Sequence, residues 1–264
     1  MNKPFKFILI TTAALSSVIM LLSWQAKKKN QEFFQLTVYH FSTSVQEKRL
    51  DNYFQNALLP ALHREGIKNI AVLKAWANDT AADKVVYVFI PLHSLDELVK
   101  NNDRLKKDQV YNIAASDYLD TDPKNPAYGR METILLRAFP LAPQMQLPSL
   151  QSSKTSRVYE LRSYESATEK KFENKVKMFN EGNEIALFKR LNFNAIFYGE
   201  VIAGSKMPNL MYMTSFENRQ DRDAHWKTFS SDSAWKELSG LPEYQNNVSH
   251  IDITFLYPTD YSDF

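Results

Sequence analysis

The stretch Val158-Tyr159-Glu160-Leu161-Arg162-Ser163-Tyr164 decides the fold because its apolar and polar side chains alternate. A period of two residues is typical of a β-strand. After it, apolar side chains recur at helical spacing from Phe172 to Phe179 and continue through Ile185, Leu187 and Leu191. Ser166 with Glu169 matches the capping-box pattern that opens a helix. The sequence therefore predicts a strand followed by a helix.

The rest of this region extends the pattern to a complete structural unit. Strand-like segments cover residues 193–202 and 210–216, Asn218 is placed to cap a second helix, and a last strand is expected over 249–257. The order β-α-β-β-α-β is that of a ferredoxin-like unit, an antiparallel sheet with helices on one face. The second face of such a sheet needs another cover.

An earlier part of the chain repeats this pattern. A shift of 125 residues places Leu36 on Leu161, Tyr39 on Tyr164 and Tyr87 on Tyr212. Prolines at 140, 143 and 148 mark an extended linker between the two copies. We therefore expect an α+β chain with one domain over residues 33–140, a linker over 141–156 and a second domain over 157–258. The two antiparallel sheets are expected to face each other within one chain.

The first thirty residues have a different composition. They carry five lysines and no acid, and an uncharged apolar run extends from Phe7 to Trp24. This is the pattern of an export signal, and its length is near the lower limit for a membrane-spanning helix. A cleaved signal peptide and a retained membrane anchor are both compatible with it. Either one predicts export across the membrane, to a periplasmic or secreted location, with membrane contact only through this segment.

Composition excludes several kinds of chemistry. The chain has 264 residues and no cysteine, which rules out disulfides, thiolate metal sites and a cysteine nucleophile. Its formal net charge is +2, and beyond the leader acidic residues outnumber basic ones, so no nucleic-acid partner is expected. The five histidines show no close metal-ligand spacing, so neither a metal nor a cofactor is assigned.

Strand alternation also selects candidate ligand-binding residues. Residues of the same parity as Tyr159 and Leu161 are expected to pack under the helices, and the opposite parity is expected on the helix-free face. The candidate ligand-binding residues, which would line a cavity on that face, are Glu160, Arg162, Tyr164, Tyr198, Glu200, Tyr212, His250 and Asp252. In one interpretation they surround a small organic ligand inside a barrel. In the other, Arg162 pairs with Glu160, Glu200 or Asp252 and only holds the sheets in register.

The stretch 158–164, with the helix after it, resembles the opening of a NIPSNAP domain. So do Arg222-Asp223-Ala224-His225-Trp226-Lys227 and Asp232-Ser233-Ala234-Trp235. The resemblance covers 157–258 well and leaves 33–140 as a diverged copy. It implies a dimeric α/β-barrel fold, here closed within one chain, and it brings no agreed catalytic residues.

Two functions from different classes follow from these observations. The first is an exported binding module for a small molecule or a protein, which is compatible with a homodimer. The alternative is an oxidoreductase of the monooxygenase kind, cofactor-free or haem-linked, that uses the barrel interior. In that alternative Arg162 holds an anionic group, and His250 or Glu200 moves a proton. Whether the protein is an enzyme, and which residues are then catalytic, stays open at this stage.

Overall fold

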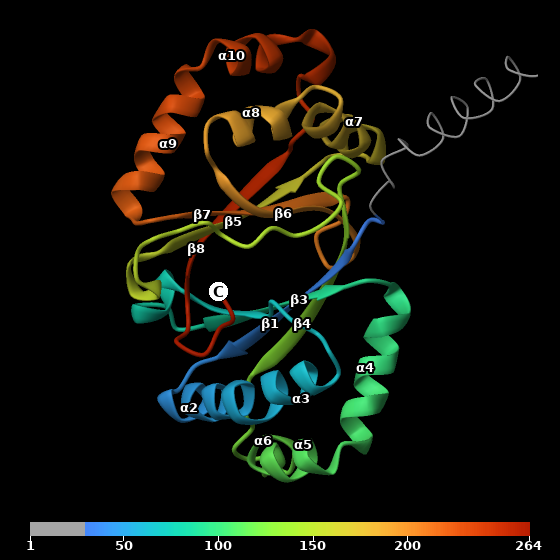
Figure 1. Cartoon of the computed structure of the whole chain (residues 1–264), viewed down its shortest axis with the longest axis vertical. Helices are drawn as coiled ribbons and strands as arrows, with labels where there is room; N and C mark the ends of the chain where they lie inside the picture. The colour runs from blue at the N-terminus through green and yellow to red at the C-terminus, as the bar shows by residue number, and fades with distance from the viewer. Residues whose placement is uncertain (1–29) are drawn as a thin grey trace, which may run out of the picture. The chain divides into compact units, whose positions relative to one another are not determined.

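Eight antiparallel strands form a closed barrel in the computed structural model, which describes residues 30–264 (Figure 1). The strands are β1 (Phe33–Phe41), β2 (Ala71–Ala75), β3 (Lys84–Leu92), β4 (Arg130–Ala138), β5 (Val158–Glu165), β6 (Asn194–Ala203), β7 (Asn209–Phe216) and β8 (His250–Pro258). Their order around the barrel is β1-β3-β2-β8-β5-β7-β6-β4. The predicted α+β class and antiparallel strands are confirmed, whereas the predicted leader lies outside the described residues, apart from Asn30.

Helices cover the outer faces of the barrel. The first half contributes α2 (Ser44–Tyr53), α3 (Leu59–Arg64), α4 (Leu95–Lys107), α5 (Gln109–Ala114) and α6 (Ser116–Leu119). The second half contributes α7 (Glu169–Asn180), α8 (Glu184–Arg190), α9 (Arg219–Ser231) and α10 (Ser233–Gly240). In Figure 1 the first group lies below the strands and the second group above them. Within residues 30–264, no helix combines the length and the apolar character that a membrane crossing requires.

Two seams close the barrel, and each joins a strand of one half to a strand of the other. Strand β4 pairs with β6, and β2 pairs with β8. Across the first seam Arg137 donates a hydrogen bond of 2.8 Å to Glu200. Within each half, the strands follow the same spatial order, β4-β1-β3-β2 and β8-β5-β7-β6.

Aromatic side chains fill the middle of the barrel. The rings of Phe34, Phe89 and Phe197 are buried, with centroids 5.0 to 5.4 Å apart. Nearer one end of the barrel, Phe264 packs against Tyr159 at a centroid distance of 6.3 Å. A cavity lies toward the other end, where β5 finishes.

Local details differ from the expected helix boundaries. Helix α7 is capped by Thr168 and not by Ser166, whose hydroxyl donates to the carbonyl oxygen of Asn247. The prediction of Asn218 as the cap of α9 is confirmed. The helix expected to continue past residue 180 is interrupted at Gly182, where a Cβ atom would lie 2.5 Å from a backbone carbonyl oxygen. The turn therefore requires glycine and separates α7 from α8.

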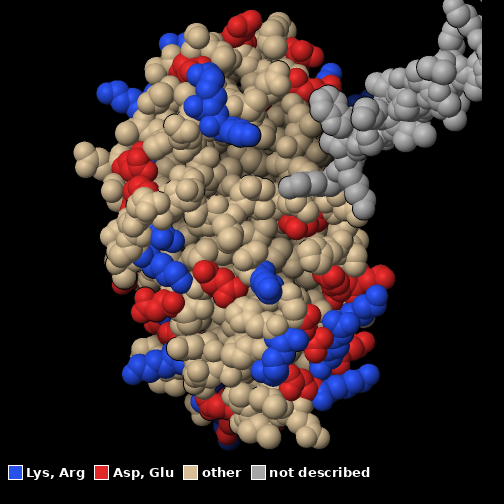
Figure 2. Space-filling model, in the orientation of Figure 1, with Lys and Arg blue, Asp and Glu red and all other residues tan. Residues whose placement is uncertain are grey.

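Charges of both signs are mixed on the surface. On the face seen in Figure 2, Lys and Arg lie among Asp and Glu over the lower part, without a large area of one sign. Such a face does not provide the continuous basic stripe that is typical of nucleic-acid binding.

Candidate functional site

The structure corrects the face assigned to most of the candidate residues. Strand residues of the parity of Tyr159 and Leu161 point into the barrel and not toward the helices. On the outer face, beneath α7 to α10 or beside them, lie Glu160, Arg162, Tyr164, Tyr198 and Tyr212. Glu200 lies at the seam with Arg137, whereas His250 and Asp252 lie at one end of the barrel. The eight residues therefore do not surround one cavity.

The reason for this error is that both faces of the sheet are buried. Alternation divides a strand into two faces, but it does not show which face meets the helices when neither meets water. The outer face carries polar side chains because they are paired with one another there.

Glu160 is the centre of that pairing. Its carboxylate has no exposed surface and accepts hydrogen bonds from Arg162 (2.6 Å), Arg222 (2.7 and 2.9 Å) and the indole of Trp226 (2.8 Å). Burial alone would raise the pKa of Glu160, but the hydrogen bonds of Arg222 and the charges of both arginines outweigh it and hold that pKa below its ordinary value. The carboxylate is therefore ionised, and both of its oxygens accept hydrogen bonds from the protein itself.

Arg162 completes this cluster. Its guanidinium carbon lies 3.7 Å from the ring centre of Trp226, and it donates to the hydroxyl of Tyr164 at 3.1 Å. The hydroxyls of Tyr164 and Tyr212 are 2.8 Å apart. The pairing of Arg162 with Glu160 agrees with the structural interpretation of this residue, but it lies within β5 and does not hold two sheets in register. The contacts of these two side chains with Arg222 and Trp226 join β5 to α9.

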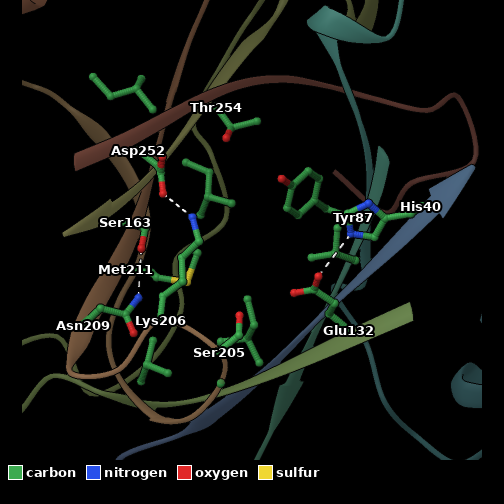
Figure 3. Close-up of a pocket in the computed structure, with 16 residues that line it drawn as sticks. His40, Tyr87, Glu132, Ser163, Ser205, Lys206, Asn209, Met211, Asp252 and Thr254 are labelled. Atoms are coloured by element: carbon green, nitrogen blue, oxygen red, sulfur yellow. Dashed lines mark hydrogen bonds and ion pairs between the residues drawn. The ribbon is translucent and has the colours of Figure 1, made fainter. Parts of the chain in front are cut away.

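A cavity of about 300 Å³ lies inside the barrel at the end where β5 finishes; we call it the mouth cavity (Figure 3). Its apolar surface comes from inward-facing side chains, namely Val38, Ile134, Leu161, Val201 and Met211. Its polar lining includes His40, Tyr87, Glu132, Ser163, Lys206, Asn209, Asp252 and Thr254. Of the eight candidates, Asp252 alone lines it.

One wall of the mouth cavity carries a charged pair. Lys206, from the turn between β6 and β7, donates to Asp252 on β8, and its nitrogen lies 3.8 Å from Glu165. The hydrogen bond from Lys206 holds the pKa of Asp252 below its ordinary value, and the same bond raises the pKa of Lys206. His250 also contacts Asp252, at 3.1 Å. Both members of the pair are therefore charged at neutral pH.

The opposite wall, shown on the right of Figure 3, is formed by His40, Tyr87 and Glu132. His40 lies between two acids, 2.9 Å from Asp83 and 3.4 Å from Glu132. Burial raises the pKa of the Tyr87 phenol, which is thus neutral and able to donate a hydrogen bond. The two walls combine charged and polar groups at the rim with an apolar interior.

Asn209 supplies the feature that points most directly to a ligand. Its side chain is buried, and its amide nitrogen donates to the hydroxyl of Ser163 at 2.9 Å. Its amide oxygen has no hydrogen-bond partner among the described residues. An unpaired buried acceptor costs free energy, so an N–H or O–H group that reaches this enclosed oxygen gains a hydrogen bond.

Glu165, His250 and Asp252 also bring three metal-ligand atoms within 4.8 Å of one another. The ammonium group of Lys206 bonds to one of these acids and lies near the other. The cluster is already balanced by a cation of the protein itself, and we assign no metal to it.

Most residues of the mouth cavity were not predicted. Ser163 belongs to the opening stretch, but it shares the parity that was assigned to the helix side. Lys206 and Asn209 lie at a turn and the start of a strand, where the sequence gives no signal for a site. If the parity of Leu161 and Ser163 had been assigned to the barrel interior, both residues would have been predicted to line a cavity, together with inward-facing residues of the opposite strands.

Solved structures show the class of fold. A protein described as a monooxygenase from Lactobacillus acidophilus NCFM is similar over 87% of this chain and 94% of its own, with a TM-score of 0.57 and 13% identity. An anthrone oxidase-like protein is similar over 88% and 93%, with a TM-score of 0.53 and 9% identity. These likenesses show the fold alone, that of the dimeric α/β-barrel proteins.

The family model of NIPSNAP matches residues 159–263, which confirms the resemblance of the second half. A NIPSNAP family protein of Agrobacterium tumefaciens strain C58 is 23% identical over 40% of this chain and 96% of its own, with a TM-score of 0.36. No curated protein matches the sequence.

Proposed function

We propose that this protein is a small-molecule binding module whose ligand occupies the mouth cavity. The observation that carries the proposal is the unpaired amide oxygen of Asn209, a residue that lines a cavity with an apolar interior and a polar rim. A volume of about 300 Å³ is at the lower end of the range for ligand pockets. The ligand is therefore small.

The lining defines the chemistry of this ligand. Apolar side chains such as Leu161 and Met211 favour a hydrocarbon body, and Asn209 favours a hydrogen-bond donor on it. Lys206 and Asp252 already neutralise each other, so a strongly charged ligand gains little from them. A small organic molecule with an apolar body and one hydroxyl or amino group fits these requirements best.

Two further proposals concern the chain as a whole. The equal strand order in the two halves supports two copies of one ferredoxin-like unit, with residues 141–156 as the linker. The basic and apolar first thirty residues support export, by a signal peptide or an anchor. Cell fractionation, together with N-terminal sequencing of the mature protein, tests export and separates the two forms of the leader.

The binding function is tested by identifying what the purified protein retains. The full chain is purified, its absorption spectrum is recorded to detect any haem, and bound molecules are released by denaturation and identified by mass spectrometry. We expect a small molecule with a hydroxyl or amino group and no haem absorbance. A retained haem, or a ligand too large for the cavity, would contradict the proposal.

A further inference from the structure

A second cavity, of about 540 Å³, lies on the outer face of the first half; we call it the tyrosine cavity. It is lined by strands β1, β3 and β4 and by helices α2, α3, α4, α5 and α6, together with Leu58 between α2 and α3. Thr37 and Tyr39 face it, whereas Val38 and His40 of the same strand face the mouth cavity. The two cavities share no lining residue, so they are separate sites.

Aromatic rings dominate one part of this cavity. Tyr39, Tyr53, Tyr111 and Tyr118 all line it. The hydroxyls of Tyr53 and Tyr111 are 3.0 Å apart, and the rings of Tyr53 and Tyr118 stack at 3.7 Å. Burial raises the pKa of each of these four phenols, so the rings are uncharged. Rings fixed in this way offer edges and faces to another aromatic ring.

A buried amide provides a polar anchor in the same space. Asn101 lies on the face of α4 that lines the cavity, with 7% of its surface exposed. Its side chain makes no hydrogen bond to any residue in the described range 30–264, and its amide is not among the fully enclosed unpaired groups, so it is open to the cavity. Asn101 is therefore placed to bind a polar group of a ligand.

The walls carry almost no charge. Lys106 is the one ionised side chain among the lining residues, and 78% of its side chain is exposed. A charged ligand would lose its hydration here without gaining a partner ion. The cavity thus selects an uncharged molecule.

The second half shows what the same region looks like when it is filled. Thr37 pairs with Val88 across β1 and β3, and Arg162 pairs with Tyr212 at the corresponding place in β5 and β7. In the second half this place is occupied by the guanidinium of Arg162 under the ring of Trp226. In the first half a threonine and a valine stand there, and both line the tyrosine cavity.

From these contacts we infer that the tyrosine cavity binds an uncharged, flat aromatic molecule that carries a hydrogen-bonding group for Asn101. This inference is independent of the ligand proposed for the mouth cavity.

Calorimetric titration of full-length Met211→Trp protein at pH 7 with 2-naphthol tests it, because this substitution fills the mouth cavity, which would itself accept a small molecule with one hydroxyl group. This parent protein is expected to show saturable binding, and the saturated analogue decahydro-2-naphthol is expected to bind several-fold more weakly because it lacks the ring contacts. Asn101→Leu, which keeps the volume of the side chain but removes its amide, should weaken 2-naphthol binding about tenfold. Leu105→Trp fills the cavity and should abolish binding.

Two controls separate this site from others. Lys107→Ala, added to the Met211→Trp parent, alters an exposed side chain of the same helix and should leave 2-naphthol binding unchanged. Wild-type protein, whose mouth cavity is open, should bind at least as much 2-naphthol as the parent does. Thermal melts establish that each variant is folded. The inference is overturned if the Met211→Trp parent shows no saturable binding, if the saturated analogue binds equally well, or if Asn101→Leu and Leu105→Trp, each folded and in this parent, keep its affinity.

Discussion

Glu160 and Arg222 lie 62 residues apart in the chain and join strand β5 to helix α9 through two hydrogen bonds, of 2.7 and 2.9 Å. The carboxylate is fully buried, and a further hydrogen-bond partner, Trp226, comes from the same helix. This contact attaches the helix layer to the barrel, and it uses residues that the sequence pattern had assigned to a ligand cavity.

Glu160→Gln should therefore destabilise the protein without affecting the mouth cavity. The change leaves Arg162 and Arg222 without their carboxylate, and breaking a buried ion pair by removing one partner typically costs about 3–5 kcal/mol. The free energy of unfolding from urea titrations measures the loss. Asp223→Asn removes the exposed partner of Arg222 and should cost less than about 1 kcal/mol. Equal losses in the two variants would contradict this account.

The same contact predicts a dependence on pH. The folded state holds the pKa of Glu160 below its ordinary value of 4.5, so the unfolded chain takes up a proton at higher pH than the folded protein does. The stability that wild-type protein has over Glu160→Gln should be complete above about pH 6 and should shrink as the pH falls below 4.5. Glu184, whose pKa is raised by burial, is present in both proteins and cancels in the comparison. A difference that stays constant down to pH 3 would refute the prediction.

Phe197→Ala tests whether the middle of the barrel is core. Phe197 is buried between Phe34 and Phe89, and removing such a ring typically costs about 3–5 kcal/mol. Leu147→Ala, at an exposed position, should change the free energy of unfolding by less than about 0.5 kcal/mol. If Phe197→Ala had an equally small effect, the barrel interior would not be the packed core described above.

Asn209→Leu tests the polar anchor of the mouth cavity. It removes the unpaired amide oxygen and should reduce ligand affinity about tenfold, as expected for one hydrogen bond. Asn56→Leu is the matched control, because it makes the same replacement at an exposed position that lines neither cavity. Binding of the retained molecule, measured by calorimetry after its identification, should be within about twofold of wild type in this control. Equal weakening in both variants would assign Asn209 a structural role only.

The strands were predictable because alternation is a local property. The stretch from Val158 onward became β5, and the expected strand over residues 210–216 differs from β7 by one residue. The break between α7 and α8 was not predictable from apolar spacing, since the spacing continues past Gly182 while the backbone turns.

The internal repeat shows where sequence comparison reaches its limit. A shift of 125 residues relates Thr37 to Arg162, but their neighbours in the sheet, Val88 and Tyr212, are 124 residues apart. The alignment of Tyr87 with Tyr212 is therefore off by one, and a slip of one residue reverses the face of a strand. Tyr87 lines the mouth cavity, whereas Tyr212 lies on the outer face.

The face of the candidate ligand-binding residues was assigned wrongly for a related reason. Polar side chains such as Glu160 and Arg162 suggested a face open to a ligand, but pairing allows them to be buried beneath helices. The residues that do line the cavity, such as Ser163 and Asn209, converge from strands whose arrangement only the three-dimensional structure reveals.

Native mass spectrometry of three proteins tests the central claim most directly: wild type, Met211→Trp and Glu160→Gln, each as the folded full chain. Met211 lines the mouth cavity, so its replacement by tryptophan should remove the retained small molecule, whereas Glu160→Gln should keep it despite its lower stability. Loss of the molecule in Glu160→Gln with retention in Met211→Trp would place the ligand beneath the helices and contradict the proposed function.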